Sequence, residues 1–81
     1  MDIRVIVGRN IRRLRKTREW SQEELAHRSG LHRTYISDVE RGNRNISVVN
    51  VHKIALALGV PAAELLEDDS LEGQSSRQTE G

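Results

Sequence analysis

The segment SQEELAHRSGLHRTYISDVERG, residues 21–42, combines side chains that can hydrogen-bond to base edges and phosphates. Its second half is expected to form a short helix whose outward residues are Arg33, Thr34, Ser37 and Asp38. An arginine can donate two parallel hydrogen bonds to guanine O6 and N7, and a threonine methyl can contact the methyl group of thymine. We therefore expect these four residues to reach bases. The alternative is that Arg33, and Arg44 in the following loop, are only solvated surface charges.

Two short helices separated by one glycine are predicted to position these side chains. Ser21 and Glu24 form an S-x-x-E capping box that predicts the start of the first helix. The first helix is expected to end at Gly30, where glycine permits a left-handed backbone. The second helix is predicted over about residues 33–40, with His32 as a poor N-cap and Leu31, Ile36 and Val39 buried. This layout predicts a helix-turn-helix, in which the second helix enters the DNA major groove. An ordinary helical hairpin is the alternative.

Three further helices complete a predicted all-α, five-helix domain. The first covers about residues 3–17, with Asp2 as N-cap and an apolar stripe of Ile3, Val7, Ile11 and Leu14. Its β-branched start leaves an extended arm over residues 3–7 as an alternative, and Gly8 would cost about 1 kcal/mol within a helix. A fourth helix is predicted between Ser47 and Gly59, with a core stripe of Val48, Val51, Ile54, Ala55 and Leu58. A fifth is predicted from Pro61 to about residue 67.

Composition excludes several classes of protein. The chain has 81 residues and no cysteine, which fits one small domain in a reducing cytoplasm. We expect this domain to span residues 1–69 and the polar tail, residues 70–81, to be disordered. No apolar run is long enough to span a membrane, and no signal peptide is visible. The three histidines show no metal-ligand spacing. No metal, cofactor, small-molecule ligand or catalytic group is expected.

The charges divide the chain into two parts. Residues 1–66 hold 12 Lys and Arg against 7 Asp and Glu, which gives a net charge of +5. Residues 67–81 hold Arg77 against five carboxylates, which gives −4, so the formal +1 of the whole chain hides a basic domain with an acidic tail. Arginine makes up most of the basic residues, and it suits bidentate contact with phosphate or guanine.

Several motifs at consistent spacing resemble the lambda-repressor-like helix-turn-helix family, over about residues 3–67. They are Gly8-x-x-Ile11-Arg12-x-Leu14-Arg15, Trp20-Ser21-Gln22-Glu23-Glu24-Leu25-Ala26, Ser29-Gly30-Leu31, Tyr35-Ile36-Ser37-x-Val39-Glu40-Arg41-Gly42 and Lys53-Ile54-Ala55-x-Ala57-Leu58-Gly59-Val60. The segment from Arg33 to Ser37, with Glu40-Arg41 and Arg44-Asn45, is similar to the controller proteins of restriction-modification systems. The chain departs from the family at Glu19, where glycine is usual, and at Ile46, where proline is common.

The resemblance implies roles for further residues. Gln22, Arg44 and Asn45 correspond to residues that contact the DNA backbone, and the hydroxyl of Tyr35 is expected to pack against it. Arg15 and Glu40 match a pair that links the first helix to the end of the third. The alternative for this pair is two exposed charges. The resemblance implies a cytoplasmic, bacterial or phage, transcriptional regulator that binds a two-fold symmetric operator and controls its own promoter.

A dimer interface is expected on the fourth and fifth helices. Val49, His52 and Leu56 recur at i, i+3 and i+7, outside the predicted core stripe, and Leu66 lies at the edge of this face. An exposed apolar strip on a small domain is typical of an association site. Scattered surface hydrophobic residues are the alternative. A rival function from another class is an antitoxin or adaptor that uses the same bundle to hold a partner protein.

Overall fold

The computed structural model describes residues 2–68, which form five helices and, within that range, no strand. The helices are α1 (Ile3–Thr17), α2 (Gln22–Ser29), α3 (Arg33–Glu40), α4 (Val48–Leu58) and α5 (Ala62–Leu66). The predicted all-α, five-helix class is therefore confirmed. The end of the predicted domain at Asp69 and the tail over residues 70–81 lie outside the described residues.

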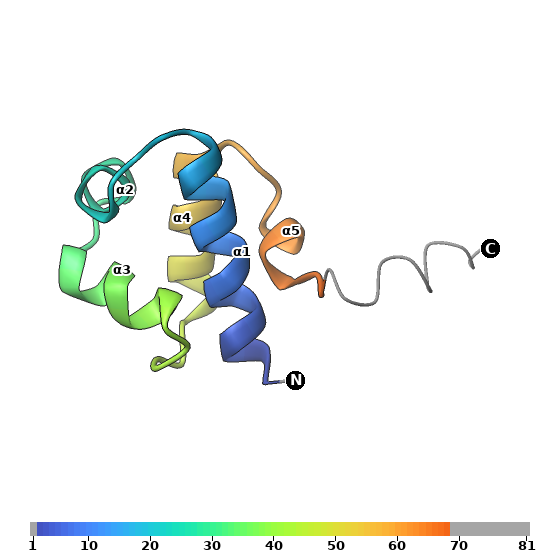
Figure 1. Cartoon of the computed structure of the whole chain (residues 1–81). Coiled ribbons are helices and arrows are strands. Elements are labelled where there is room, and N and C mark those ends of the chain that lie inside the picture. Colours follow the sequence, from blue (N-terminus) through green and yellow to red (C-terminus); the bar gives the residue numbers. More distant parts are fainter. Residues whose placement is uncertain (1, 69–81) are drawn as a thin grey trace.

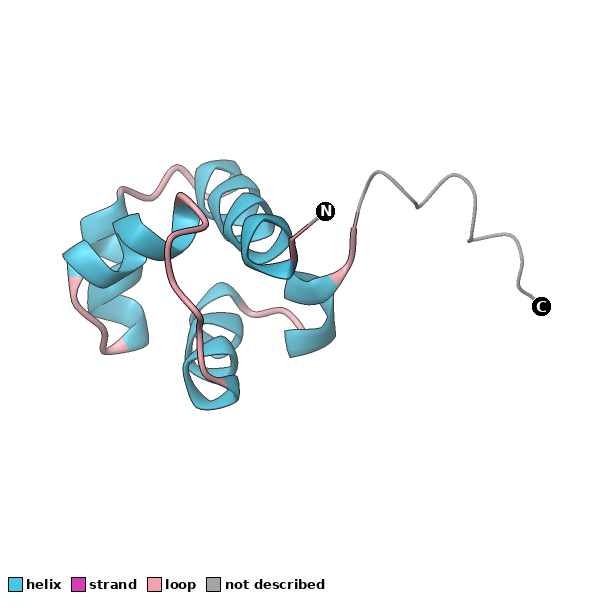
Figure 2. Ribbon diagram, turned by 90° about the horizontal axis from the view of Figure 1, so that it is seen from below, coloured by secondary structure: helices cyan, strands magenta, loops and turns pink. Residues whose placement is uncertain are grey.

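The helices enclose a single core. Helix α1 packs against α3 on one side and α5 on the other, while α2 packs against α3 and α4. Figure 1 shows α2 and α3 together on one side of α1 and α5 on the opposite side. Figure 2, seen from below, shows α1 and α4 on opposite sides of the centre. This arrangement leaves the outward faces of α1, α3 and α4 available for separate contacts.

Local signals explain where the helices start and end. Asp2, Ser21 and Ser47 cap α1, α2 and α4 by accepting hydrogen bonds from main-chain N–H groups. The side chain of Arg4 donates hydrogen bonds to Asp2 and lowers the pKa of that carboxyl to about 2, so the cap stays charged at about pH 4, where an ordinary aspartate is partly protonated. Since α1 is regular from its first residue, the alternative of an extended arm over residues 3–7 is wrong.

Each of the five helices contributes one large side chain to the centre of the core. These side chains are less than 2% exposed and belong to Ile11, Leu25, Ile36, Ile54 and Leu65. The prediction that Val48 belongs to the core stripe of α4 is wrong, because this side chain is 84% exposed. Val48 is the first residue of α4, which begins outside the edge of the core. Ile46, two residues earlier, packs against the core instead.

Gly8 brings α1 and α3 into close contact. A Cβ at this position would lie 2.8 Å from the main-chain oxygen of Glu40 and would also clash with that of Val39. Both obstacles are backbone atoms, which cannot move aside as a flexible side chain can. Gly8 lowers the helix propensity of α1, but the close approach of α3 leaves room for no larger residue.

The turn after α1 uses a strained residue. Glu19 has a φ of 59°, a left-handed backbone conformation that glycine, the residue usual at this position in the family, adopts without strain. A side chain in this conformation costs roughly 1–2 kcal/mol. The turn directs Trp20 back against the core, where its ring is half-buried.

We predict that Gly8→Ala lowers the free energy of unfolding by about 1–3 kcal/mol, the usual cost of overpacking. The added methyl group would clash with α3, which outweighs the gain of about 1 kcal/mol in helix propensity. Urea titration followed by circular dichroism measures the change. The matched control is Lys16→Ala, an exposed position of the same helix, where the change should stay within about 0.5 kcal/mol. Equal stability of Gly8→Ala and the natural sequence would contradict the prediction.

Candidate nucleic-acid interface

The outward face of α3 is fixed by its buried face. Ile36 and Val39 are at most 2% exposed and anchor the helix in the core. Arg33 and Thr34 are therefore exposed at the start of α3, and Ser37 and Asp38 lie half-buried one turn later. The four residues predicted to reach bases thus share one side of α3, with the two most accessible at its N-terminal end.

Two arginines after α3 hold the side chains of its last turn. Arg41 donates hydrogen bonds to Ser37 Oγ and to Asp38 Oδ1, both at 2.7 Å. Arg44 Nε lies 3.6 Å from Asp38 Oδ2. Asp38 thus pairs with two cations, and this carboxylate can position both guanidinium groups. Sequence reasoning assigned no role to Arg41, although its spacing of three and four residues from Asp38 and Ser37 could have indicated both contacts.

Tyr35 connects α3 to α4 and to the loop between them. Its hydroxyl accepts a hydrogen bond of 3.0 Å from Asn50 Nδ2, and the guanidinium of Arg44 lies 4.9 Å from the ring centroid. Because the phenolic oxygen acts as acceptor here, its hydrogen can still be donated to a phosphate. Asn50 was not singled out from the sequence, since this contact joins residues from two helices. Asn45, next to Arg44 in the loop, is exposed.

Gln22 lies at the first position of α2, beside the end of α3. Its side-chain amide donates a hydrogen bond of 3.0 Å to Glu40 Oε1. The second amide hydrogen can still be donated to a phosphate, together with the main-chain N–H groups at the start of α2. The structure therefore places Gln22 between the N-terminus of α2 and the C-terminus of α3.

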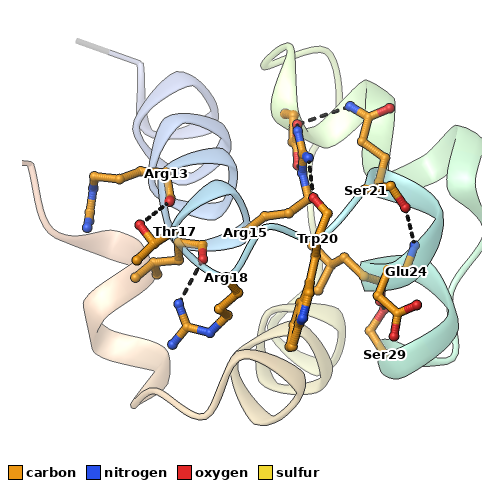
Figure 3. A network of polar contacts seen from close by, with 12 residues as sticks. Arg13, Arg15, Thr17, Arg18, Trp20, Ser21, Glu24 and Ser29 are labelled. Atoms are coloured by element: carbon orange, nitrogen blue, oxygen red, sulfur yellow. Dashed lines mark hydrogen bonds and ion pairs between the residues drawn. The ribbon is translucent and has the colours of Figure 1, made fainter.

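Arg15 and Glu40 form a buried, bidentate ion pair. Arg15 Nε lies 2.7 Å from Glu40 Oε2 and Arg15 Nη2 lies 2.9 Å from Glu40 Oε1. Their side chains are 10% and 3% exposed, so the alternative of two exposed charges does not hold. The third donor of Arg15, Nη1, bonds the main-chain oxygen of Trp20 at 2.8 Å, a contact visible in Figure 3. The hydrogen bond to Glu40 raises the pKa of Arg15 above its ordinary value.

A smaller aromatic contact supports the turn between α1 and α2. The guanidinium of Arg28 lies 4.2 Å from the centroid of the Trp20 ring, and Arg28 also pairs with Glu24 on α2. Figure 3 shows the Trp20 side chain extending away from the Arg15 contact, beside α2. Trp20 therefore contributes to packing through its ring and to the Arg15 contact through its backbone.

The side chains expected at a dimer interface are exposed. Val49, Leu56 and Leu66 are 59%, 66% and 48% exposed, and His52 is exposed as well. Leu66 lies beside Val48 and Ile3 at a hollow of about 200 Å³ between α1, α4 and α5. The exposed apolar surface is therefore larger than predicted, because it includes Ile3 and Val48, which the sequence pattern assigned to buried stripes.

Residues 2–68 contain neither a cluster of potential metal ligands nor a helix that could span a membrane. No three His, Asp or Glu side chains of this range gather closely enough to hold a metal ion. No helix there has both the length and the apolar character that crossing a bilayer requires.

Known proteins are similar to this chain in both sequence and fold. A helix-turn-helix family model matches residues 11–65. Control protein C.BamHI of Bacillus amyloliquefaciens is 49% identical over 67 residues, 82% of this chain and 83% of that protein. The hypothetical transcription factor NHTF from Neisseria matches with a TM-score of 0.85 and 45% identity, over 90% of this chain and 84% of that one. The restriction-modification controller protein C.Esp1396I, solved as a tetramer with its natural 35-base-pair operator, matches with a TM-score of 0.71 and 31% identity, over 83% and 99%.

We predict that removing either Arg15 or Glu40 alone is more damaging than removing both. Arg15→Met and Glu40→Gln each leave a buried group without its partner, at a cost of about 3–5 kcal/mol, whereas the double variant leaves no lone charge. Chemical denaturation of the four proteins gives the coupling energy. Strictly additive losses would mean that the pair does not interact.

Proposed function

This chain belongs to the helix-turn-helix family and is a DNA-binding transcriptional regulator, and we propose that it binds a two-fold symmetric operator as a homodimer through the outward face of α3. One observation carries the proposal. Arg33 is exposed at the start of α3, and Arg41 and Arg44 pair with Asp38 at its other end, so three arginines and one aspartate occupy α3 and the loop that follows it. Since the carboxylate of Glu40 is buried against Arg15, this surface has a positive charge, as an interface with DNA requires.

We propose that the base contacts come from the start of α3. Arg33 and Thr34 are exposed there and belong to the N-terminal part of a recognition helix, which approaches base edges most closely. Ser37 and Asp38 lie one turn further along, where Arg41 holds them. In this arrangement Arg33 provides most of the sequence preference, because a bidentate contact with guanine discriminates strongly between bases.

We propose that phosphate contacts surround these base contacts. Gln22 lies at the N-terminus of α2 beside the end of α3, Tyr35 lies on α3, and Arg44 and Asn45 lie in the loop that follows it. Arg44 stacks over the Tyr35 ring, which keeps its charge near the hydroxyl of that residue. Contacts of this kind fix the orientation of the protein on the duplex without reading its sequence.

We propose that two copies associate through the exposed face of α4 together with Leu66 of α5. Val49, His52 and Leu56 have the spacing of one helical face, and all three are exposed. Burying this apolar strip between two copies would remove it from water. A two-fold axis there would place two α3 helices about 34 Å apart, the separation at which two half-sites are contacted from one side of the duplex.

The similarity to C.BamHI and C.Esp1396I supports a controller role in a restriction-modification system, which would include control of the chain's own promoter. C.Esp1396I assembles as a tetramer on its operator, so a pair of dimers is the larger assembly to expect for this chain. We place this activity in the bacterial cytoplasm, where the DNA lies. An antitoxin or adaptor would instead hold a protein partner and bind mixed duplex DNA without a steep dependence on salt.

We predict that Arg33→Ala and Arg44→Ala affect DNA binding differently. On a duplex selected from a random pool, Arg33→Ala should cost about 1–3 kcal/mol and relax the sequence preference. Arg44→Ala should weaken binding to selected and random duplexes similarly and reduce the salt slope by about one. Fluorescence anisotropy over a range of salt concentrations separates the two effects. Equal losses on selected and random duplexes for Arg33→Ala would show that this residue does not contact bases.

We also predict that Leu56→Glu yields a folded monomer with weakened operator binding. Leu56 is 66% exposed, so the charge leaves the core intact but opposes burial of the apolar strip. Analytical ultracentrifugation at micromolar concentration gives the oligomeric state, and circular dichroism gives the helical content. Arg12→Glu, a charge change at an exposed position of α1 outside this face, is the matched control and should remain dimeric. A Leu56→Glu variant that stays dimeric would place the interface elsewhere.

A further inference from the structure

The outward face of α1 forms a stripe of positive charge that the proposed operator contacts do not use. Its members are exposed and recur at i, i+3, i+4 and i+7: Arg9, Arg12, Arg13 and Lys16, called the basic stripe below. With Asn10 they line a shallow hollow of about 320 Å³. Helix α1 contains no acidic residue, so its own sequence supplies no carboxylate to balance these charges.

The described part of the chain ends at the edge of this stripe. Asn10, only 3% exposed, donates hydrogen bonds through Nδ2 to the main-chain oxygens of Leu65 at 2.9 Å and Glu67 at 2.7 Å. Asn10 also accepts a hydrogen bond of 3.4 Å from Arg13. The buried amide therefore ties the end of α5 to the stripe, and Glu67 is placed beside it.

The segment that begins at this point has the complementary charge. Residues 67–72 read EDDSLE and carry four carboxylates, which matches the four cations of the basic stripe. From Glu67 the chain can extend at most about 17 Å to Glu72, and the stripe from Arg9 to Lys16 is about 10 Å long. The segment is thus long enough to follow the whole stripe.

We propose that the acidic segment 67–72 docks along the basic stripe of α1 and covers it against the phosphates of nucleic acid. Exposed ion pairs are individually weak, but the tether keeps the carboxylates at an effective concentration on the order of millimolar beside the stripe. The segment starts beside α5, and α3 lies on the opposite side of α1, as Figure 1 shows. The tail therefore reaches the stripe before it reaches the operator-binding surface, and it reduces non-specific binding without blocking α3.

A nitroxide label on the tail tests the docking directly. The chain has no cysteine, so Ser75→Cys provides a single attachment site. At low salt the label should cause loss of the amide NMR signals of residues 9–16, and the signals should return in 1 M salt, where charges are screened within about 3 Å. Neutralising the segment with Glu67→Gln, Asp68→Asn, Asp69→Asn and Glu72→Gln should also restore them. The matched control, Glu23→Gln on α2, should leave the loss unchanged.

A second measurement tests whether the segment covers the stripe. The neutralised protein should bind random duplex DNA with a salt slope steeper by about one to two than that of the natural sequence. An unchanged slope would overturn the covering role. Signal loss centred on residues 33–45, or spread evenly over the domain, would overturn the docking itself. Both measurements are independent of operator recognition by α3, so their failure leaves the proposed function standing.

Discussion

The ion pair between Arg15 and Glu40 is the interaction on which the orientation of α3 depends. The arginine uses all three nitrogens, two on Glu40 and one on the main chain of Trp20, so it joins α1 to the end of α3 and to the turn before α2. Gln22 adds a bond from α2 to the same carboxylate. Such a buried pair need not increase net stability, because removing two charges from water is costly. Its effect is on geometry: a rotation of α3 about its axis would break the bidentate contact and redirect the residues that we propose to contact bases.

Close packing reinforces this electrostatic constraint. The backbone of α1 at Gly8 touches the main-chain oxygens of the last turn of α3, near the residue that binds Arg15. The same turn of α3 is thus held by a steric contact and by an ion pair. The strained conformation of Glu19 supports the same set of contacts, because the turn that contains Glu19 brings the carbonyl of Trp20 to Arg15. These contacts on the inner side of α3 therefore determine the direction in which its outward face points.

Much of the fold could be predicted from the sequence, because its signals are local. Caps at Asp2, Ser21 and Ser47 and left-handed glycines at 30 and 59 mark helix ends without tertiary information. The exposure of Val48 could not be predicted, since helical spacing shows which face a residue shares but not where the core ends. The contact of Asn50 with Tyr35 joins two helices, and no spacing within one helix reveals it. For Arg15 and Glu40, spacing suggested nothing across 25 residues, and the family resemblance supplied the expectation.

We propose that the outward face of α3 contacts DNA in the orientation set by the Arg15–Glu40 pair. The most direct test is NMR chemical-shift mapping of the full chain as a duplex selected from a random pool is added. We expect the largest shift changes at Arg33 and Thr34, with smaller changes at Gln22 and across the loop over residues 43–45. Shift changes concentrated on α4 and α5, or on the basic stripe of α1, with α3 unaffected, would contradict the account.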